Sequence, residues 1–254
     1  MPVRGCCHPD SPRGQAQASE TMKIADYHRH LAPIYHYHIE QGSDGWHALR
    51  RGMITASTIS RLITGTGKPA NNDTSRTKLL QLLGERITGE SDASFYGDDM
   101  ARGHMLEPLA RDIYAEHREP VAECGFVTAD FDGTVIGYSP DGLVGDDGLI
   151  EIKSPRTKHH LRSLLSDEVP TEYVPQVQTG LAVTGRRWCD YISYAPGLPL
   201  FIHRCKRDEV VIAQLIAAAQ AAEAELQRLM ELYTTKSAIF PATEPIQPEQ
   251  EIFI

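Results

Sequence analysis

The chain has 254 residues, 41% of them hydrophobic, and a formal net charge of −9. This length allows a sizeable core, and the acidic balance excludes a protein coated in basic residues, so contact with nucleic acid has to come from local basic patches. No apolar run approaches the roughly 20 residues of a membrane span, and the N-terminus lacks an apolar signal core. We therefore expect a cytoplasmic protein without membrane contacts.

The five cysteines are scattered along the chain. None of them forms the paired CxxC spacing that is typical of a zinc site, so reduced thiols are expected.

One folded domain is predicted between two loose ends. Residues 1–21 are rich in Pro, Gly, Ser and Gln without periodicity, which predicts a disordered leader. Residues 236–254 form a Pro- and Glu-rich tail. Residues 22–235 mix helical and strand patterns and contain no linker strong enough to split them. We predict an α/β domain there, with a central mixed β-sheet flanked by helices.

Four histidines stand close together near the start of this domain: His28, His30, His36 and His38. No Cys or acidic partner lies at ligand spacing, and histidines beside aromatic residues pack readily without metal. We expect packing here rather than a metal site.

The next segment predicts a seat for an anion. Thr55 or Ser57 can cap a helix that continues through Ile63, and Arg50 precedes that helix. The N–H groups at a helix N-terminus attract anions. Six basic residues and one acid lie between Arg50 and Lys78, although a run of this kind, taken alone, is more often a solvated surface.

Two amphipathic helices are predicted next, from about Ser75 to Arg86 and from about Asp98 to His117. Pro108 falls inside the second helix, where a proline removes a hydrogen bond and predicts a kink or a local restart. Glu107 stands beside it. An acid next to a kink can be turned toward a metal, although a solvated glutamate is the commoner outcome.

The remainder of the chain alternates strands and helices. Strands are predicted at about 123–129, 134–138 and 149–153, helices at about 157–166 and 172–184, and strands at about 188–194 and 200–206. A long helix follows, capped by Asp208 and ending near Leu232. Arg156 and Lys158 form a second basic patch in a stretch without acids, from Lys153 through Arg162.

A hairpin through the Gly-Asp-Asp-Gly turn at residues 145–148 would bring Asp141 beside Glu151. Glu151 and Lys153 lie two apart on a strand and share a face, while Ile150 and Ile152 point into the core. Two carboxylates suit a hard cation such as Mg²⁺, which also uses waters and phosphate oxygens. The lysine could orient or deprotonate an attacking water.

Surface charges on a hairpin are the ordinary explanation of such residues. An inward group of charges, however, needs a partner that offsets its desolvation. A bound metal would be such a partner.

These residues also carry a family resemblance. Pro140-Asp141 followed by Glu151-Ile152-Lys153 resembles the signature of PD-(D/E)XK nucleases. Further stretches, at residues 40–57, 103–107 and 176–178, resemble in the same order the lambda-exonuclease, or YqaJ-type viral recombinase, branch. The resemblance implies a restriction-endonuclease-like PD-(D/E)XK nuclease fold and a single exonuclease domain over residues 22–235.

The resemblance implies a role for each matched residue of the catalytic centre. Asp141, Glu151 and the carbonyl of Ile152 would bind Mg²⁺, or Mn²⁺ in its place, and Glu107 would hold a second ion or its water. Lys153 would position the nucleophilic water. Gln178, or failing that Gln176, would hydrogen-bond near Lys153 and hold the site.

The resemblance also implies a substrate and partners. Arg50 and Ser57 would take the 5′-phosphate of linear double-stranded DNA, with Lys68, Arg156 and Gln176 as further substrate-binding candidates. Degradation from 5′ to 3′ would leave 3′ single-stranded overhangs for phage-type recombination. A homotrimeric ring around the duplex and a single-strand annealing protein would be the partners, and an acidic exterior can coexist with a basic channel.

Three other functions fit part of the pattern. A restriction-like or structure-selective endonuclease would use the same chemistry. A catalytically inactive DNA- or protein-binding module would lack one of the acids or the lysine, and all three are present. A hydrolase of small phosphate esters would leave the basic patches unexplained.

Overall fold

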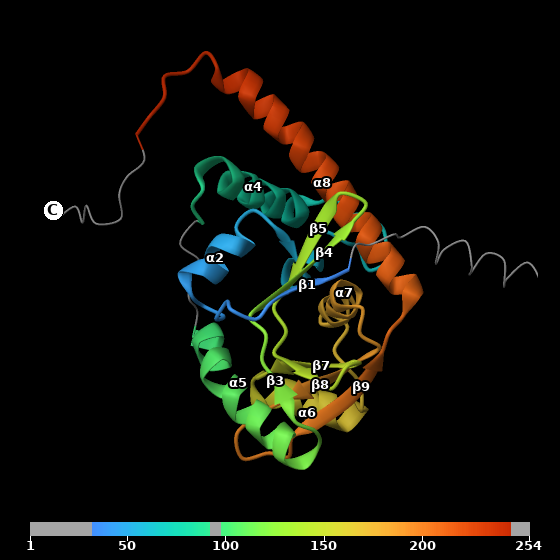
Figure 1. Cartoon of the computed structure of the whole chain (residues 1–254). Coiled ribbons are helices and arrows are strands. Elements are labelled where there is room, and N and C mark those ends of the chain that lie inside the picture. Colours follow the sequence, from blue (N-terminus) through green and yellow to red (C-terminus); the bar gives the residue numbers. More distant parts are fainter. Residues whose placement is uncertain (1–31, 92–97, 245–254) are drawn as a thin grey trace, which may run out of the picture.

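The computed structural model describes residues 32–91 and 98–244 (Figure 1). The leader predicted for residues 1–21, His28, His30 and the last ten residues of the predicted tail lie outside these ranges. No helix within the described ranges combines the length and the apolar character needed to cross a membrane.

The described strands divide between two sheets, with the orders β1-β4-β5-β2 and β3-β6-β7-β8-β9. They are β1 (Ile34–His36), β2 (Ile54–Thr55), β3 (Val121–Ala122), β4 (Phe126–Phe131), β5 (Thr134–Tyr138), β6 (Gly142–Val144), β7 (Gly148–Lys153), β8 (Trp188–Ser193) and β9 (Phe201–Lys206). Each sheet is mixed, because β2 runs parallel to β5 and β7 runs parallel to β8, whereas the other pairs are antiparallel. The predicted α/β class is confirmed, with two mixed sheets in place of one.

The helices pack around and between these sheets. They are α2 (Asp44–Arg50), α3 (Ala56–Ile59), α4 (Asp73–Thr88), α5 (Asp98–His117), α6 (Thr157–Ser166), α7 (Val174–Thr184) and α8 (Glu209–Ser237). Asp208 caps α8 as predicted, since its side chain accepts from the N–H groups of Val210 and Val211 at 3.0 and 3.1 Å. The helix ends at Ser237, past Leu232 and inside the predicted tail.

Two predicted features of the N-terminal half differ in the structure. The helix expected to reach Ile63 ends at Ile59 after a single turn. The helix around Pro108 runs without a restart from Asp98 to His117, so the proline is accommodated inside one helix.

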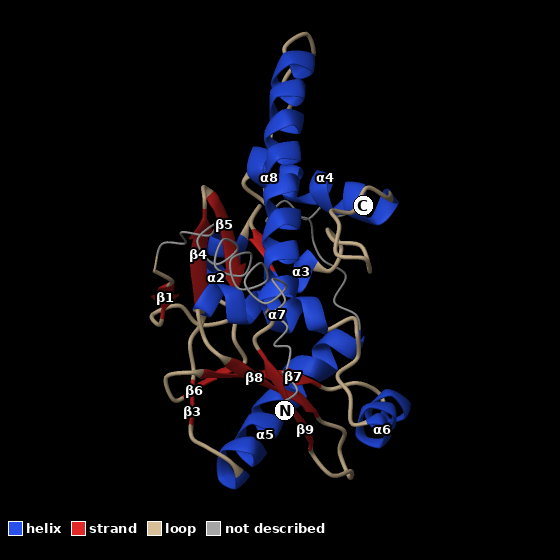
Figure 2. Cartoon of the chain, turned by 90° about the vertical axis from the view of Figure 1, so that its right-hand side faces the viewer, coloured by secondary structure: helices blue, strands red, loops and turns tan. Residues whose placement is uncertain are grey.

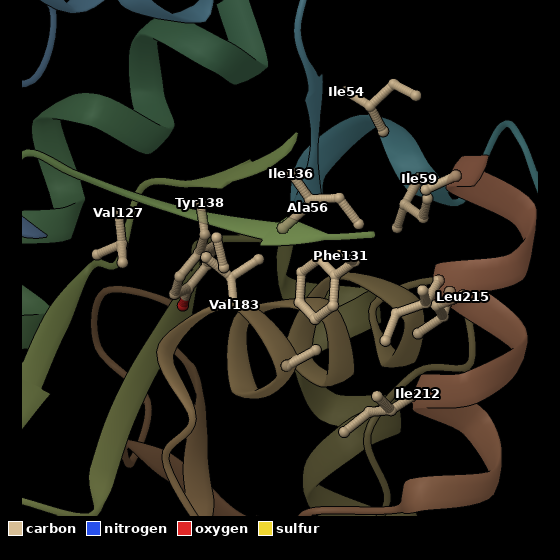
Figure 3. Packing of buried hydrophobic residues seen from close by; sticks show 14 of the residues in the cluster. Ile54, Ala56, Ile59, Val127, Phe131, Ile136, Tyr138, Val183, Ile212 and Leu215 are labelled. Carbon is tan, nitrogen blue, oxygen red and sulfur yellow. The ribbon is translucent and has the colours of Figure 1, made fainter. Parts of the chain in front are cut away.

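Helix α7 lies between the two sheets (Figures 1 and 2). Its residues from Val177 to Thr184 are all buried. Leu181 and Val183 belong to the larger core, which contains residues of both sheets and of α3, α4 and α8 (Figure 3). Gly180 lets the ring of Tyr138 approach closely, because a Cβ there would lie only 2.7 Å from its Cζ.

Helix α5 covers the opposite face of the second sheet. Tyr114 of α5 packs there with Ile150 and Ile152 in a second core, so the predicted inward direction of these isoleucines is confirmed. The Tyr114 hydroxyl donates to the buried Asp190 at 2.7 Å. Because β7 is covered by α5 on this face, its other face, with Glu151, points toward α7 and the cleft described below.

Candidate active site

The predicted hairpin forms between β6 and β7. The pairing is antiparallel, with Gly142 opposite Ile150 and Val144 opposite Gly148. Asp141 stands directly before β6, and its Oδ2 accepts from the N–H of Ile152 at 2.6 Å. This bond fixes the Asp141 carboxylate beside the strand that carries Glu151, as the spacing predicts.

Glu151 is fully buried, and three side chains donate to its carboxylate. Lys153 Nζ and Gln176 Nε2 donate to Oε1 at 2.7 and 2.5 Å. The hydroxyl of Tyr138 donates to Oε2 at 3.0 Å. A buried carboxylate without such partners would be strongly unfavourable, so these three donors compensate for the burial of Glu151 beneath the cleft. Tyr138 has no counterpart among the predicted residues.

The structure corrects the choice between the two glutamines of α7. Gln178 Nε2 donates to the carbonyl of Lys206 at 2.9 Å, and its Oε1 accepts from the N–H of Asp208 at 2.9 Å. Gln178 therefore supports the turn between β9 and α8, away from Lys153, and the expectation that it holds the site is wrong. Residues two apart on a helix do not share a face, and Gln176 is the one that faces Glu151.

Glu107 is held by a residue that the sequence reasoning missed. Arg111, one helical turn further along α5, donates from Nη2 to Glu107 Oε1 at 2.6 Å and from Nε to the carbonyl of Asp141 at 2.8 Å. The spacing of four residues between an acid and a base on a helix is the signal that could have found the pair. Glu107 is thereby placed near the hairpin.

The charges of this centre raise two carboxyl pKa values. Burial, with the neighbouring Glu151 and Glu107, raises the pKa of Asp141 well above its usual range. Burial also raises the pKa of Glu107, against the opposing effect of Arg111. Burial lowers the pKa of Lys153, but Glu151 and Asp141 outweigh this effect and raise it, so its ammonium stays charged. The nearby cations Arg111 and Lys153 therefore do not fully balance the negative charge of these carboxylates.

A divalent cation would supply the missing positive charge, and the oxygen donors fit Mg²⁺. Asp141, Glu151 and the carbonyl of Ile152 are the ligands that such a hard ion prefers. Among the residues that the structure describes, no three His, Cys, Asp or Glu side chains form a complete metal-binding group. Water or phosphate oxygens would have to complete the coordination, as is usual for Mg²⁺.

The predicted anion seat is built from side chains. Arg50 donates from Nη1 to Ser139 Oγ at 2.9 Å and from Nη2 to Ser57 Oγ at 3.4 Å, and its guanidinium lies 4.2 Å from the Trp46 ring centroid. Burial lowers its pKa to about 10, which leaves it charged at neutral pH. Because α3 is only four residues long, the seat depends on Arg50 and the hydroxyls, and the predicted contribution of a long helix is absent.

One cleft of about 1100 Å³ joins this seat to the carboxylates. The predicted residues that line it are Arg50, Ser57, Glu107, Asp141, Glu151, Ile152, Lys153, Arg156 and Gln176. Three cations that were not predicted as site residues, Arg102, Lys158 and Arg162, extend its basic wall. Lys68 is exposed on its loop and is not among the lining residues.

Of the four clustered histidines, the structure describes His36 and His38. His36 forms a hydrogen bond between its Nε2 and Thr128 Oγ1 at 3.2 Å, and its ring meets that of His38 edge-on. The hydrogen bond to Thr128 attaches β1 to β4.

Comparisons with known proteins identify a family and similar folds. Residues 45–187 match the YqaJ-like viral recombinase domain. Two crystal structures of an alkaline exonuclease (LHK-Exo) from Laribacter hongkongensis, one in complex with dAMP, share 36% sequence identity with the chain. Each gives a TM-score of 0.69 and covers 77% of this chain and 98% of its own.

A phage-related exonuclease from Haemophilus somnus 129PT is similar in fold alone, with 12% identity and a TM-score of 0.53 over 71% of this chain and 96% of its own. No curated protein matches the chain.

Proposed function

Because the chain belongs to the YqaJ-like viral recombinase family and has the predicted PD-(D/E)XK nuclease fold, we propose that it is a Mg²⁺-dependent exonuclease. It hydrolyses linear double-stranded DNA from 5′ to 3′ and leaves 3′ single-stranded overhangs for recombination by strand annealing. One observation carries the proposal: the carboxylates with Lys153 and the seat around Arg50 line the same cleft.

The residues of the centre have distinct tasks in this hydrolysis. Asp141, Glu151 and the Ile152 carbonyl would hold Mg²⁺, which supplies stabilisation of the negative charge that develops on the phosphate. Glu107 would hold a second ion or a water bound to it. Glu151 and Asp141 raise the pKa of Lys153, so it orients the attacking water by donating a hydrogen bond. Gln176 keeps Glu151 in place.

The seat around Arg50 explains why hydrolysis would begin at a DNA end that carries a 5′-phosphate. A guanidinium can bind a terminal phosphate through two parallel hydrogen bonds. Ser57 and Ser139 already contact this guanidinium, so their hydroxyls are placed to bind the same phosphate. The basic wall of the cleft, which includes Arg156, then contacts the phosphate backbone of the duplex through electrostatic attraction.

We further propose that three copies form a ring around the duplex and that a single-strand annealing protein takes up the overhang, in the cytoplasm of a bacterial host. The support is the contrast between the net charge of −9 and the cations that line the cleft. The mass of the purified protein by light scattering tests the ring, because a monomer in solution contradicts it.

The decisive experiment compares three DNA substrates in Mg²⁺: linear duplex with 5′-phosphate, linear duplex with 5′-hydroxyl, and a covalently closed circle. The first should lose its 5′-ended strands as mononucleotides and leave 3′ single strands, the second should be degraded more slowly, and the third not at all. Rapid cutting of the circle would instead establish an endonuclease. Asp141→Ala and Lys153→Ala should each abolish hydrolysis with the fold intact, and unchanged turnover in either would refute its assignment.

Arg50→Ala separates end recognition from chemistry. It should reduce the preference for 5′-phosphate while DNA with a 5′-hydroxyl is cut at the rate of the unmodified enzyme. Equal loss on both substrates would place Arg50 in the chemical step instead.

A further inference from the structure

Arg111 connects three separate parts of the chain beside the proposed metal site. Its Nη2 bonds to Glu107 on its own helix, its Nε to the carbonyl of Asp141 between β5 and β6, and its Nη1 lies 3.3 Å from Glu123 Oε2. The Arg111 side chain is only 15% exposed, and that of Glu107 is 23% exposed. The guanidinium is therefore held in one orientation from both sides.

We propose that Arg111 is a positioning residue, which sets the separation of Glu107 and Asp141 and thereby the affinity of the site for its divalent cation. This inference rests on the proposed function, because it takes both carboxylates as metal ligands. The two residues come from different elements, a helix that contains Pro108 and the link that leads into β6. The Arg111 guanidinium bonds to both.

The geometry requires a guanidinium rather than any cation. A guanidinium presents several donors in one rigid plane, so a single group can bind a carboxylate and a carbonyl at once. A lysine ammonium carries the same charge on a flexible stem and does not fix the angle between two acceptors. Arg111→Lys therefore keeps the charge beside the cation and removes the positioning.

Charge alone predicts the opposite behaviour. A cation near Mg²⁺ repels it. If charge alone mattered, a variant with a neutral residue at position 111 would bind Mg²⁺ more tightly, and Arg111→Lys would bind it as the unmodified protein does. Positioning predicts weaker binding in both Arg111→Lys and Arg111→Gln. Groups that orient metal ligands typically change metal affinity by about 10- to 100-fold when they are replaced, and the loss for Arg111→Lys should fall in this range.

Arg86 offers a matched control. It also bonds to a carboxylate and a backbone carbonyl, through Glu223 at 2.7 and 2.8 Å and Gly52 at 2.7 Å, but it joins α4 to α8 outside the cleft. Arg86→Lys should lower the melting temperature without changing the concentration of Mg²⁺ that half-saturates the protein. Glu123→Gln should have little effect, since Glu123 is 75% exposed.

The experiment titrates Mg²⁺ twice for each variant, once by thermal shift without DNA and once by the rate of cleavage of 5′-phosphorylated linear duplex. For Arg111→Lys, both half-saturating concentrations should rise about tenfold or more, and saturating Mg²⁺ should recover most of the rate. Unchanged half-saturation, with only a lower melting temperature as in Arg86→Lys, overturns the inference. Tighter binding in Arg111→Gln overturns it as well.

The two proposals fail in different ways. If the unmodified protein binds Mg²⁺ but does not cleave DNA, the proposed function is wrong and the thermal-shift titration still tests Arg111. If the protein cleaves DNA and the Arg111 variants keep its Mg²⁺ dependence, only the positioning role is wrong.

Discussion

Replacing Tyr138 by phenylalanine removes one donor from the buried Glu151 and changes little else. The hydroxyl donates to Glu151 Oε2 at 3.0 Å, and both side chains are almost completely inaccessible to solvent. A hydrogen bond to a charged group contributes about 1.5–3 kcal/mol. In a domain of this size, each kcal/mol of lost stability lowers the melting temperature by roughly 2–4 °C. The melting temperature of Tyr138→Phe should therefore fall by about 3–12 °C.

Cleavage should also slow, because the freed oxygen of Glu151 no longer holds its orientation toward the proposed cation. Loss of a group that orients a metal ligand typically costs about 10- to 100-fold in activity or metal affinity. The assay is the steady-state rate on 5′-phosphorylated linear duplex at several Mg²⁺ concentrations, with calorimetry on the same samples.

Tyr114→Phe is the matched control. It removes a hydroxyl from another buried carboxylate, Asp190, which keeps two hydrogen bonds from Arg204 at 2.7 and 2.8 Å. It should therefore lower the melting temperature by less and leave cleavage unchanged. If Tyr138→Phe cleaves at the rate of the unmodified protein, or if both variants slow equally, the role given to Tyr138 is refuted.

Three further predictions concern the same centre. Gly180→Ala should displace the Tyr138 ring, which costs about 1–3 kcal/mol of stability and slows cleavage. The higher helix propensity of alanine relative to glycine, about 1 kcal/mol, offsets part of this cost. Calorimetry and turnover measurements check both effects. Gln176→Ala should slow cleavage, whereas Gln178→Ala should lower stability in urea by about 1–3 kcal/mol and leave turnover nearly unchanged. Because the pKa of Asp141 is raised in the folded, metal-free protein, the folded state keeps a proton that the unfolded chain releases at about pH 3.9. The stability of the metal-free protein should therefore fall as the pH rises from about 4 toward that raised pKa, and added Mg²⁺ should reverse the loss. A melting temperature independent of pH would contradict this.

The local elements were predictable because short-range chemistry marks their ends. Asp-Gly turns bound the strand Thr134–Tyr138, whose limits agree with the prediction. Helix α6, at Thr157–Ser166, also agrees with the predicted limits. The direction of side chains on β7 followed from the period of two, which placed Glu151 and Lys153 on one face.

The choice between Gln176 and Gln178 could not be predicted in this way. Helix α7 lies between two sheets and is buried on nearly all sides from Val177 onward, so no polar face indicates its orientation. Which glutamine meets Glu151 depends on contacts with β7 and with the turn before α8. The contact of Arg111 with the Asp141 carbonyl, across 30 residues, is of the same long-range kind.

The division of the strands into two sheets has a consequence for the site. Arg50 and Ser57 belong to segments that flank β2 of the first sheet, whereas Glu151 and Lys153 belong to β7 of the second. The chain crosses between the sheets from β5 to β6. Ser139, within that crossing, accepts hydrogen bonds from both Arg50 and Trp46 at 2.9 and 3.0 Å.

Asp141 is only two residues further along this crossing. The distance between the proposed phosphate seat and the carboxylates is therefore set by how the two sheets are held together, by α7 and by the bonds of Ser139. A change that loosens this junction should reduce the discrimination between phosphorylated and hydroxyl ends more than it reduces hydrolysis itself, because each half of the site stays intact on its own sheet.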